Sequence, residues 1–571
     1  MESSSQELVD FVVVGGGTAG SVIAARLSEN PDAQVCVIEA GLSRAGDPNV
    51  DMPTGVGKML GNPDYDWNYH SVPQGLGIKG WSFNDLLPYF KRHEMLEANQ
   101  PNITERDISE RPLDVGLHGL GGPIHTSMAT WSVPFETPLL AALDDTSGIP
   151  RPVDPYNGSH LGFYRSLLAI DRTARPVRSY AATGYLPVSS LRPNLRVLTS
   201  ALVTRIILEP DSDGILTARG VEINHQGSIR RILATKEVIL CAGSLKSPQI
   251  LELSGIGDQS VLQNVNIPCL QPNSHVGSNL QEKTMAAVVY ELGPDEMSLD
   301  SLFRDVNFAK EHLNLYMNSH TGALSGSNDL MGFVPFASLA NSVGIDEAVG
   351  TAVSTTPSPG QNPGFQQKQQ RLIAARLRDR NSASIQLLAS PANFNIAEGH
   401  ANCAKLISGP PPGTDRSCYG LIVSNMYPLS RGTVHIRSSD PEDEPAIDPG
   451  FLTHPSDAHI LATGLAFADR VFQSKHLEGK VGRRVDPPPE VNLQDDDSAR
   501  RFVRERIVSY HHALGTCALG QVVDDRLRVK GIRGLRVCDA SVLPMQVSAA
   551  ILATVYAVAE KAAEMIASDN A

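Results

Sequence analysis

The chain has 571 residues, which indicates two to four structural units, and its 41% hydrophobic and 19% charged residues are typical of a soluble globular enzyme. Its 48 basic and 62 acidic residues leave a net charge of −14. This balance argues against nucleic acid and anionic membranes as partners, because both attract clustered Lys and Arg.

The cysteines and the apolar runs bear on whether the protein has disulfides, a metal site or a membrane span. The seven cysteines are scattered, odd in number and without a C-x-x-C pair, so we expect neither a disulfide framework nor a metal site. The start of the chain lacks a basic region followed by a long apolar run, and no later run is long enough to span a membrane. We therefore expect a soluble intracellular protein, cytoplasmic and without a membrane partner; no motif indicates an oligomeric state.

A dinucleotide-binding unit is predicted at the start of the chain. Residues 11–14 are apolar and rich in Val, which is typical of a strand buried on both faces of a parallel sheet. A glycine-rich turn follows over 15–20, and the pattern then predicts a helix over 21–29 and a second buried strand over 35–38 that ends in Glu39. This order of strand, turn, helix, strand and acid is the dinucleotide-binding fingerprint.

Each part of the fingerprint has a chemical reason. Gly15 allows the tight turn, Gly17 lets the backbone approach the pyrophosphate, and Gly20 lets the helix and strand pack closely. The helix N-terminus points N–H groups at the phosphates, and Glu39 binds ribose hydroxyls, which disfavours NADP. The fingerprint alone fits both FAD and NAD. The residues predicted to contact the dinucleotide here are Gly15, Gly17, Thr18, Ala19, Gly20, Glu39 and Ala40.

The middle of the chain is predicted to be rich in β-structure. Alternating and continuous apolar runs predict strands over 194–208, 220–223, 231–233 and 237–243. A helix over 249–253 is predicted to open at Ser247-Pro248 and to close near Gly255, because Pro suits the first helical turn and Gly the position after the last. Farther on, Pro, Gly, Ser and Gln are frequent in residues 354–370, which predicts a mobile loop.

The segment from Gly243 to Gly257, GSLKSPQILELSGIG, resembles the second signature of the glucose–methanol–choline (GMC) oxidoreductases, which are FAD-dependent alcohol oxidases and dehydrogenases. Other stretches resemble the same family over nearly the whole chain, namely residues 66–69 with 73–74, 276–280, 430–436 and 510–517. After 276–280 the family usually continues with Asp-His, where this chain has Glu282-Lys283. The resemblance implies FAD as the cofactor and a small-molecule alcohol as the substrate.

The resemblance also implies a fold class, α/β within a molecule that is α+β overall. A GMC-type FAD-binding βαβ domain would be interleaved with a substrate domain built on an antiparallel sheet. The expected boundaries are residues 7–74, 190–290 and 502–571 for the FAD-binding domain, and residues 75–189 and 291–501 for the substrate-binding domain.

The C-terminal part carries the chemistry in this family. The stretch 510–517 matches the motif that places the catalytic base at His512. An alcohol becomes a good hydride donor only as its oxygen loses its proton, so a base of near-neutral pKa such as histidine is needed. If the segment is extended, His511 points the other way, and we expect it to be structural. The resemblance further assigns Val203, Asp539 and Ala540 to the cofactor site.

Two departures from the family pattern bear on activity. The family places a second His or Asn beside the catalytic His, and the matching position here is Ala550, whose side chain forms no hydrogen bond. The first family signature, a loop that holds the flavin, is missing where residues 75–79 connect Gln74 directly to the next helix. Three explanations stay open: a mispredicted or alternatively spliced product, a variant that binds FAD differently, or a homologue that kept the fold and lost catalysis.

The resulting hypothesis is an FAD-dependent oxidoreductase that oxidises an alcohol in specialised metabolism of aromatic or polyketide-like compounds. One alternative is a catalytically impaired or non-catalytic homologue that acts by binding. Another is a lyase, because the same fold hosts FAD-containing cyanohydrin lyases. The fold by itself does not separate these functions.

Overall fold

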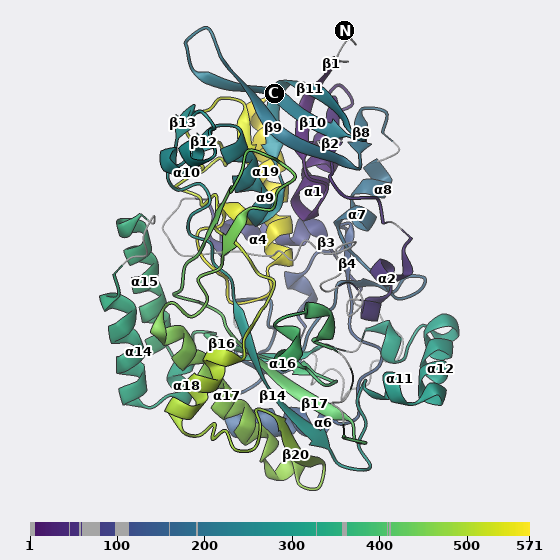
Figure 1. The fold of residues 1–571 in the computed structure, drawn as a ribbon. Coiled ribbons are helices and arrows are strands. Elements are labelled where there is room, and N and C mark those ends of the chain that lie inside the picture. The colour runs from purple at the N-terminus through teal and green to yellow at the C-terminus, as the bar shows by residue number, and fades with distance from the viewer. Residues whose placement is uncertain are drawn as a thin grey trace.

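Two seven-stranded sheets organise the chain, the first at the top of Figure 1 and the second at the bottom. The computed structural model describes residues 6–44, 46–55, 59, 80–97, 113–158, 160–189, 192–326, 328–356, 362–407, 409 and 413–571. The family-like residues 66–69 and 73–74 and the shortened junction at 75–79 therefore lie outside the described residues. Within those ranges, no helix has the length and apolar character needed to cross a bilayer.

The first sheet has a parallel half and an antiparallel half. Its order is β8 (Leu195–Leu198), β2 (Val35–Ile38), β1 (Gln6–Val14), β11 (Ser228–Leu240), β10 (Leu216–His225) and β9 (Ala201–Pro210), and β22 (Leu535–Val537) also pairs with β11. Strands β8, β2, β1, β11 and β22 run parallel, whereas β11, β10 and β9 form an antiparallel meander. The buried parallel strands and the meander expected from the apolar pattern are thus confirmed, with 231–233 and 237–240 joined in one long strand.

Helices α1 (Thr18–Leu27), α9 (Gly243–Leu253), α19 (Leu552–Asp569) and α4 (Phe83–His93) surround the first sheet, with α19 packed between α1 and α4. Helix α1 begins three residues earlier than expected because Gly17 is its N-cap. Helix α9 begins at Gly243, so Pro248 lies inside it. The proline leaves the Ser244 carbonyl without its helical donor, and the buried Thr516 hydroxyl donates to that oxygen instead at 2.6 Å.

The second sheet is antiparallel throughout, as the resemblance implied. Its order is β20 (Val481–Asp486), β14 (Thr284–Leu292), β17 (Cys418–Asn425), β16 (Ile385–Ser390), β15 (Leu330–Val334) and β5 (Gly162–Arg165), and β21 (Val508–Ser509) pairs with β14. Helices α6 (Glu136–Ser147), α17 (Pro455–Phe472) and α18 (Asp496–Glu505) pack around it. A separate hydrophobic core lies against each sheet.

The loop expected over 354–370 is wrong for residues 363–370, which belong to helix α15 (Pro363–Arg378). The neighbouring helix α14 (Ser342–Ser354) ends where the expected loop begins, and residues 357–361 lie outside the described residues. Helix α15 starts at Pro363 because Asn362 caps it, its side chain accepting a hydrogen bond from the backbone N–H of Phe365 at 3.1 Å. The polar glutamines that favoured a loop are buried in this helix at Gln366, Gln369 and Gln370. The polar composition of this stretch predicted a loop, whereas the structure places its glutamines on the buried face of a helix.

The remaining elements are short or peripheral. The other strands are β3 (Glu94–Leu96), β4 (Ile124–Thr126), β6 (Ile170–Asp171), β7 (Val177–Arg178), β12 (Ile256–Gly257), β13 (Gln271–Pro272), β18 (Thr433–His435) and β19 (Ala446–Asp448). The other α-helices are α2 (Pro48–Asp51), α7 (Ala181–Gly184), α8 (Leu186–Ser189), α10 (Gln259–Asn264), α11 (Ser301–Arg304), α12 (Val306–Asn314), α13 (Phe336–Leu339) and α16 (Ile396–Gly399). The shortest turns are η1 (Pro53–Gly55), η2 (Val115–Leu117), η3 (Leu315–Ser319), η4 (Ala323–Ser325), η5 (Cys403–Lys405), η6 (Lys475–Leu477) and η7 (Ala540–Val542).

Candidate active site

The carboxyl ends of four parallel strands meet at one edge of the first sheet. Strand β1 runs into Gly15, β2 into Glu39, β11 into Cys241, and β22 into Asp539 one residue beyond Cys538. Ligands of open α/β sheets bind at this kind of edge. The predicted dinucleotide residues of the first 40 positions therefore lie together where such a ligand is expected.

The three glycines of the fingerprint have different surroundings. Gly15 has φ of +101°, and a Cβ on it would meet the Cys241 carbonyl oxygen at 2.5 Å. A Cβ on Gly20 would collide with the Gly15 carbonyl oxygen, so helix α1 and the turn touch there. Nothing lies within 4 Å of a Cβ placed on Gly17. Gly15 and Gly20 thus keep the turn closed, and Gly17 leaves open space on its outer side.

The N-terminus of helix α1 faces that open space. Gly17 is its N-cap, no side chain caps it, and no acidic residue lies in its first turn. The N–H groups of Thr18 and Ala19 therefore have no side-chain cap at the positive end of the helix dipole, and the nearby Glu39 carboxylate bonds to Gly16 N, before the helix begins. An uncapped helix start beside space that a side chain would fill fits the pyrophosphate of a dinucleotide.

The Glu39 side chain connects the turn after β1 with the turn after β2 at this edge. Its carboxylate accepts hydrogen bonds from Gly16 N at 2.6 Å and from Gly41 N at 2.7 Å, one on each oxygen. Each carboxylate oxygen has a second lone pair, so the group can also accept from ribose hydroxyls. Ala40 beside it is exposed, whereas Val203 is buried in β9 at 5% exposure.

Asp539 joins the C-terminal strand to helix α9. One carboxylate oxygen accepts from Gly243 N at 2.9 Å and from Ser247 Oγ at 2.5 Å, and the other accepts from Ser541 N at 2.8 Å. Burial raises the pKa of Asp539 above its ordinary value, and these donors partly offset the rise. Asp539 therefore joins the segment after β22 to the family-like segment at the start of α9, and Ala540 beside it is buried.

His512 lies beyond the end of β21, in a segment without regular strand pairing. Its neighbour His511 has φ of +60°, so the segment is kinked there and the simple alternation of an extended strand does not apply. The His512 side chain is 7% exposed, and its ring centroid lies 4.2 Å from that of Tyr510. Gln546 Nε2 donates to the His512 carbonyl oxygen at 2.7 Å. The candidate base is thus buried and held through its backbone.

Glu282 bonds to the backbone of this kinked segment. Its Oε1 accepts a hydrogen bond from the backbone N–H of His512 at 2.8 Å. Burial raises the pKa of Glu282 to about 8. The carboxyl group supplies the acceptor that a regular strand pairing would have provided, so it helps to position the His512 backbone.

The next residue, Lys283, reaches the other side of the site. Its side chain is fully buried, and Nζ donates to the Ala549 carbonyl oxygen at 2.8 Å. Burial lowers the pKa of Lys283 to about 7. Ala549 and Ala550 are exposed, so the chain reaches the surface where Lys283 meets it.

Sequence reasoning missed a buried amide network behind His512. Gln281 and Gln369 both donate through Nε2 to Asn279 Oδ1 and to the Pro544 carbonyl oxygen. Gln546 continues the network to His512. Asn279 belongs to the family-like segment 276–280 and was the available signal, but Gln281 follows that segment and Gln369 belongs to the stretch expected to be a loop.

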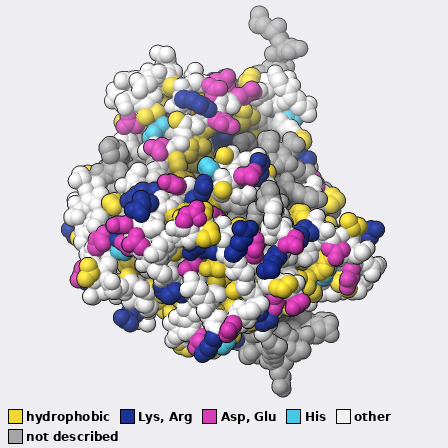
Figure 2. Space-filling view, turned by 60° about the horizontal axis from the view of Figure 1, so that its bottom comes forward, with side chains coloured by type: hydrophobic (Ala, Val, Ile, Leu, Met, Phe, Trp, Pro, Cys, Tyr) yellow, Lys and Arg dark blue, Asp and Glu magenta, His cyan; other side chains and the backbone are white. Residues whose placement is uncertain are grey.

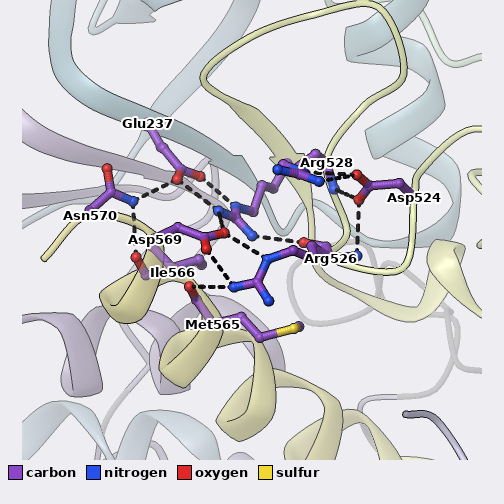
Figure 3. Close-up of polar contacts among 9 residues, drawn as sticks. Glu237, Asp524, Arg526, Arg528, Met565, Ile566, Asp569 and Asn570 are labelled. Atoms are coloured by element: carbon purple, nitrogen blue, oxygen red, sulfur yellow. Dashed lines mark hydrogen bonds and ion pairs between the residues drawn. The ribbon is translucent and has the colours of Figure 1, made fainter. Parts of the chain in front are cut away.

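A second constellation lies away from the carboxyl edge. A cavity of about 530 Å³ is lined by Glu237, Asp569, Arg528, Arg536 and the turn before β22, at the amino end of the parallel strands. Arg536 contacts Glu237 at 2.6 Å and Asp569 at 2.7 Å, and Figure 3 shows Arg526 and Arg528 directed at Asp569 and Asp524. Because opposite charges pair throughout, this network anchors the end of α19 and does not present a cationic ligand site.

One trio has the donor atoms that a metal ion could use. Glu97, His125 and Asp171 bring three such atoms within 4.8 Å of one another. The carboxylates are engaged already: Glu97 accepts from Arg172 N at 3.0 Å and Asp171 from Thr173 N at 2.9 Å. These contacts account for the trio as a link between β4, β6 and the end of β3.

Surface charge is mixed where Figure 2 shows it. Lys and Arg side chains alternate with Asp and Glu over that face, and no extended field of one sign appears on it. A nucleic-acid interface would need a basic stripe.

Comparison with known proteins identifies relatives along the chain. The N-terminal model of the GMC oxidoreductase family matches residues 9–285, and its C-terminal model matches residues 428–559. Dehydrogenase mpl7 of Monascus purpureus is 53% identical over 604 aligned positions, covering 98% of this chain and 96% of the relative. Since 604 exceeds 571, the relative has residues with no counterpart here.

More distant relatives also match this chain over nearly its whole length. Pyranose dehydrogenase 3 of Leucoagaricus meleagris is 30% identical over 98% of this chain and 93% of its own length. An FAD-dependent oxidoreductase from Chaetomium thermophilum has a similar solved structure, with a TM-score of 0.86 at 26% identity over 98% of this chain and 99% of that one. The βαβ unit and the antiparallel sheet are thus parts of one shared architecture.

Proposed function

Because the chain belongs to the GMC oxidoreductase family, we propose that it oxidises the CH–OH group of a small-molecule alcohol with FAD as the hydride acceptor. The dinucleotide end of FAD would be held by the turn at Gly15 and Gly17, the start of helix α1 and Glu39. The open space at Gly17 and the uncapped helix support this assignment. Ala40, Val203, Asp539 and Ala540 would support the same site from neighbouring segments.

His512 is the proposed base. When bound, FAD supplies the two-electron acceptor for the hydride that leaves the alcohol carbon. His512 accepts the hydroxyl proton, so the carbon becomes a carbonyl as the C–H and O–H bonds break. The observation that carries this proposal is the buried position of His512, held at its N–H by Glu282 and at its carbonyl by Gln546.

The test is anaerobic reduction of the flavin. The purified holoprotein is mixed with benzyl alcohol, 4-methoxybenzyl alcohol or glucose, and bleaching of the flavin bands is followed. His512→Ala is expected to slow bleaching by about 10²- to 10⁴-fold, since a positioned base contributes that much. His511→Gln is the matched control and is expected to keep the wild-type rate within about threefold. Equal rates in His512→Ala and the wild type would remove His512 from this role.

The substrate class and setting are part of the proposal. Two relatives bear the names of dehydrogenases, and one of these acts on a pyranose. A substrate hydroxyl, as in a sugar, fits the proposed removal of a hydroxyl proton by His512. We propose specialised metabolism of aromatic or polyketide-like alcohols as the setting. Growth of product carbonyl in step with flavin reduction would support the assignment to a CH–OH donor.

A second candidate is a homologue that binds FAD and does not turn over. The alanine at position 550 favours it, because no side chain there holds the substrate oxygen. A yellow protein whose flavin stays oxidised with every alcohol tested, and which reduces normally with dithionite, would support this candidate against the oxidase or dehydrogenase.

A further inference from the structure

We propose that the alcohol oxidised at this site carries a carboxylate and that the Arg376 guanidinium, on helix α15, binds that carboxylate. The inference rests on the proposed oxidation at His512 and names the class of its substrate. No covalent step is added: Arg376 pairs with the carboxylate at one end of the substrate, and His512 acts on the hydroxyl group at the other.

The 544–548 segment connects helix α15 with the proposed base. Gln369 of α15 donates through Nε2 to the first carbonyl oxygen of this segment. Gln546, at its middle, donates to the His512 carbonyl oxygen at 2.7 Å. Arg376 follows Gln369 by two helical turns, so both side chains lie on one face of the helix, about 10 Å apart along its axis. That face of α15 therefore follows the segment that contacts the base.

Tyr427 connects Arg376 to the far end of the same segment. Arg376 Nη1 donates to the Tyr427 hydroxyl at 2.6 Å, and the guanidinium carbon lies 4.4 Å from the ring centroid. Tyr427 is 3% exposed, and its hydroxyl also interacts with the Ser548 side chain. Ser548 is half-buried, and the next two residues, Ala549 and Ala550, are exposed. The guanidinium is thus held one tyrosine away from the exposed end of the segment.

The Arg376 guanidinium has donors to spare. It is half-buried, and among the residues that the structure describes no carboxylate lies within ion-pair distance of it and no acceptor faces its Nε or Nη2. These two nitrogens share one edge of the guanidinium, an arrangement that binds both oxygens of a carboxylate. Arg378 differs, because its Nη1 lies 2.9 Å from Asp346 Oδ1. Arg376 therefore has the charge and the geometry for an anion from outside the described chain.

Two other cations of this region are already engaged. Arg431 is 5% exposed, and its nitrogens donate to Gln369 Oε1 and to two backbone carbonyl oxygens. Lys283 has no exposed surface, and its Nζ donates to the Ala549 carbonyl oxygen at 2.8 Å. Neither offers the open edge that Arg376 has.

The surroundings of Ser548 favour negative charge. His160 Nε2 lies 3.2 Å from the Ser548 carbonyl oxygen. Burial lowers the pKa of His160, and positive charge on Lys283 and Arg376 lowers it further. Burial also raises the pKa of Glu282, the acid beside Lys283, to about 8, so this acid is mostly uncharged at neutral pH. A carboxylate at this end of the segment would meet a positive potential.

The first experiment compares an acid with its uncharged ester. Anaerobic flavin reduction in the holoprotein is followed with 4-(hydroxymethyl)benzoate and with its methyl ester, and the ratio of their second-order rate constants is measured. This acid-to-ester ratio is expected to be at least about tenfold higher in the wild type than in Arg376→Met, since a charge-assisted hydrogen bond contributes that much. The loss should come mainly from weaker binding of the acid. The intrinsic reactivities of the two alcohols cancel in this comparison.

Arg378→Met is the matched control, because Arg378 lies on the same helix and pairs with an acid on the surface. It should keep the wild-type acid-to-ester ratio within about twofold. Arg376→Lys keeps a charge without the planar fork and should recover part of the ratio. An equal loss of the ratio in Arg378→Met and Arg376→Met would overturn the proposal.

A second measurement needs neither turnover nor a variant. Isothermal titration calorimetry of the wild-type holoprotein with 4-methylbenzoate and with 4-methylbenzamide compares an anion with a neutral molecule of similar shape. The anion should bind at least about tenfold more tightly, and its dissociation constant should rise with ionic strength because salt screens the pair. Equal affinities for the two molecules would overturn the proposal.

The outcomes separate this inference from the proposed function. If no alcohol reduces the flavin, but 4-methylbenzoate binds to the wild type and not to Arg376→Met, the proposed function fails and the carboxylate site stands. If the wild type is reduced with the same acid-to-ester ratio as Arg376→Met, only the inference fails.

Discussion

Gly17 and Gly20 lie three residues apart in one turn, yet a side chain would meet different surroundings at each. Gly17 has open space on its outer side, whereas Gly20 touches the Gly15 carbonyl oxygen. The first position therefore concerns the ligand and the second concerns the packing of helix α1. Substitutions at the two positions should separate binding from stability.

Gly17→Thr is expected to leave the unfolding free energy of the apoprotein within about 0.5 kcal/mol, because the site is open and Thr suits a helix N-cap. It should weaken FAD binding by at least about tenfold, since the side chain occupies the space beside the helix start. Gly20→Ala should cost about 1–3 kcal/mol by overpacking. Urea unfolding and flavin fluorescence titration measure both effects, and equal loss of stability in the two variants would contradict the distinction.

At the scale of elements, helix α9 shows how a distant residue completes local structure. The proline at position 248 leaves the Ser244 carbonyl without a helical donor, and the Thr516 hydroxyl supplies one across 272 positions of the chain. The helix consequently starts four residues before the Ser247-Pro248 pair from which its start was expected. Element boundaries here depend on a tertiary contact.

Thr516→Val is expected to destabilise the protein by about 1–3 kcal/mol, because it leaves a buried carbonyl without a donor while keeping the side-chain volume. Thr463→Val is the control. Its hydroxyl donates to the His459 carbonyl oxygen within helix α17, an oxygen that the helix ladder already engages, so the change should stay within about 0.5 kcal/mol. Similar urea midpoints for the two variants would show that α9 does not need the Thr516 hydroxyl.

At the scale of the whole molecule, three segments join the two sheets around the site. Residues 279–283 form hydrogen bonds with 510–515, and the buried glutamines connect both to 544–546. The proposed FAD contacts come from the first sheet, and the proposed base follows the last strand of the second. A ligand that spans this junction should stabilise the whole molecule.

Removal of FAD is expected to lower the thermal midpoint of the protein. A ligand present at about 100 times its dissociation constant stabilises the folded state by about 2.7 kcal/mol. Differential scanning calorimetry with and without added FAD measures the shift, and Gly17→Thr should reduce it. A thermal midpoint of the wild type that does not change when FAD is added would count against a specific FAD site.

Much of the site could be predicted from local pattern. The glycine turn, the buried strands and the stretch around His512 each have a signal within a few residues. The family match confirms the predicted oxidoreductase family and the mixed fold. The loop expected over 354–370 was wrong at residues 363–370, because polar composition does not show whether glutamines are exposed or, as at Gln369, buried in a network.

The sequence by itself determined the dinucleotide fingerprint, the position of His512 in its motif and the absence of a polar side chain at Ala550. Only the tertiary structure decided that Glu282 holds His512 and that Lys283 reaches Ala549, over separations of 230 and 266 residues. The physical reason is that the spacing of apolar residues and the residue types in turns report only on structure a few residues away. Burial and hydrogen bonding between distant segments depend instead on how the two sheets pack.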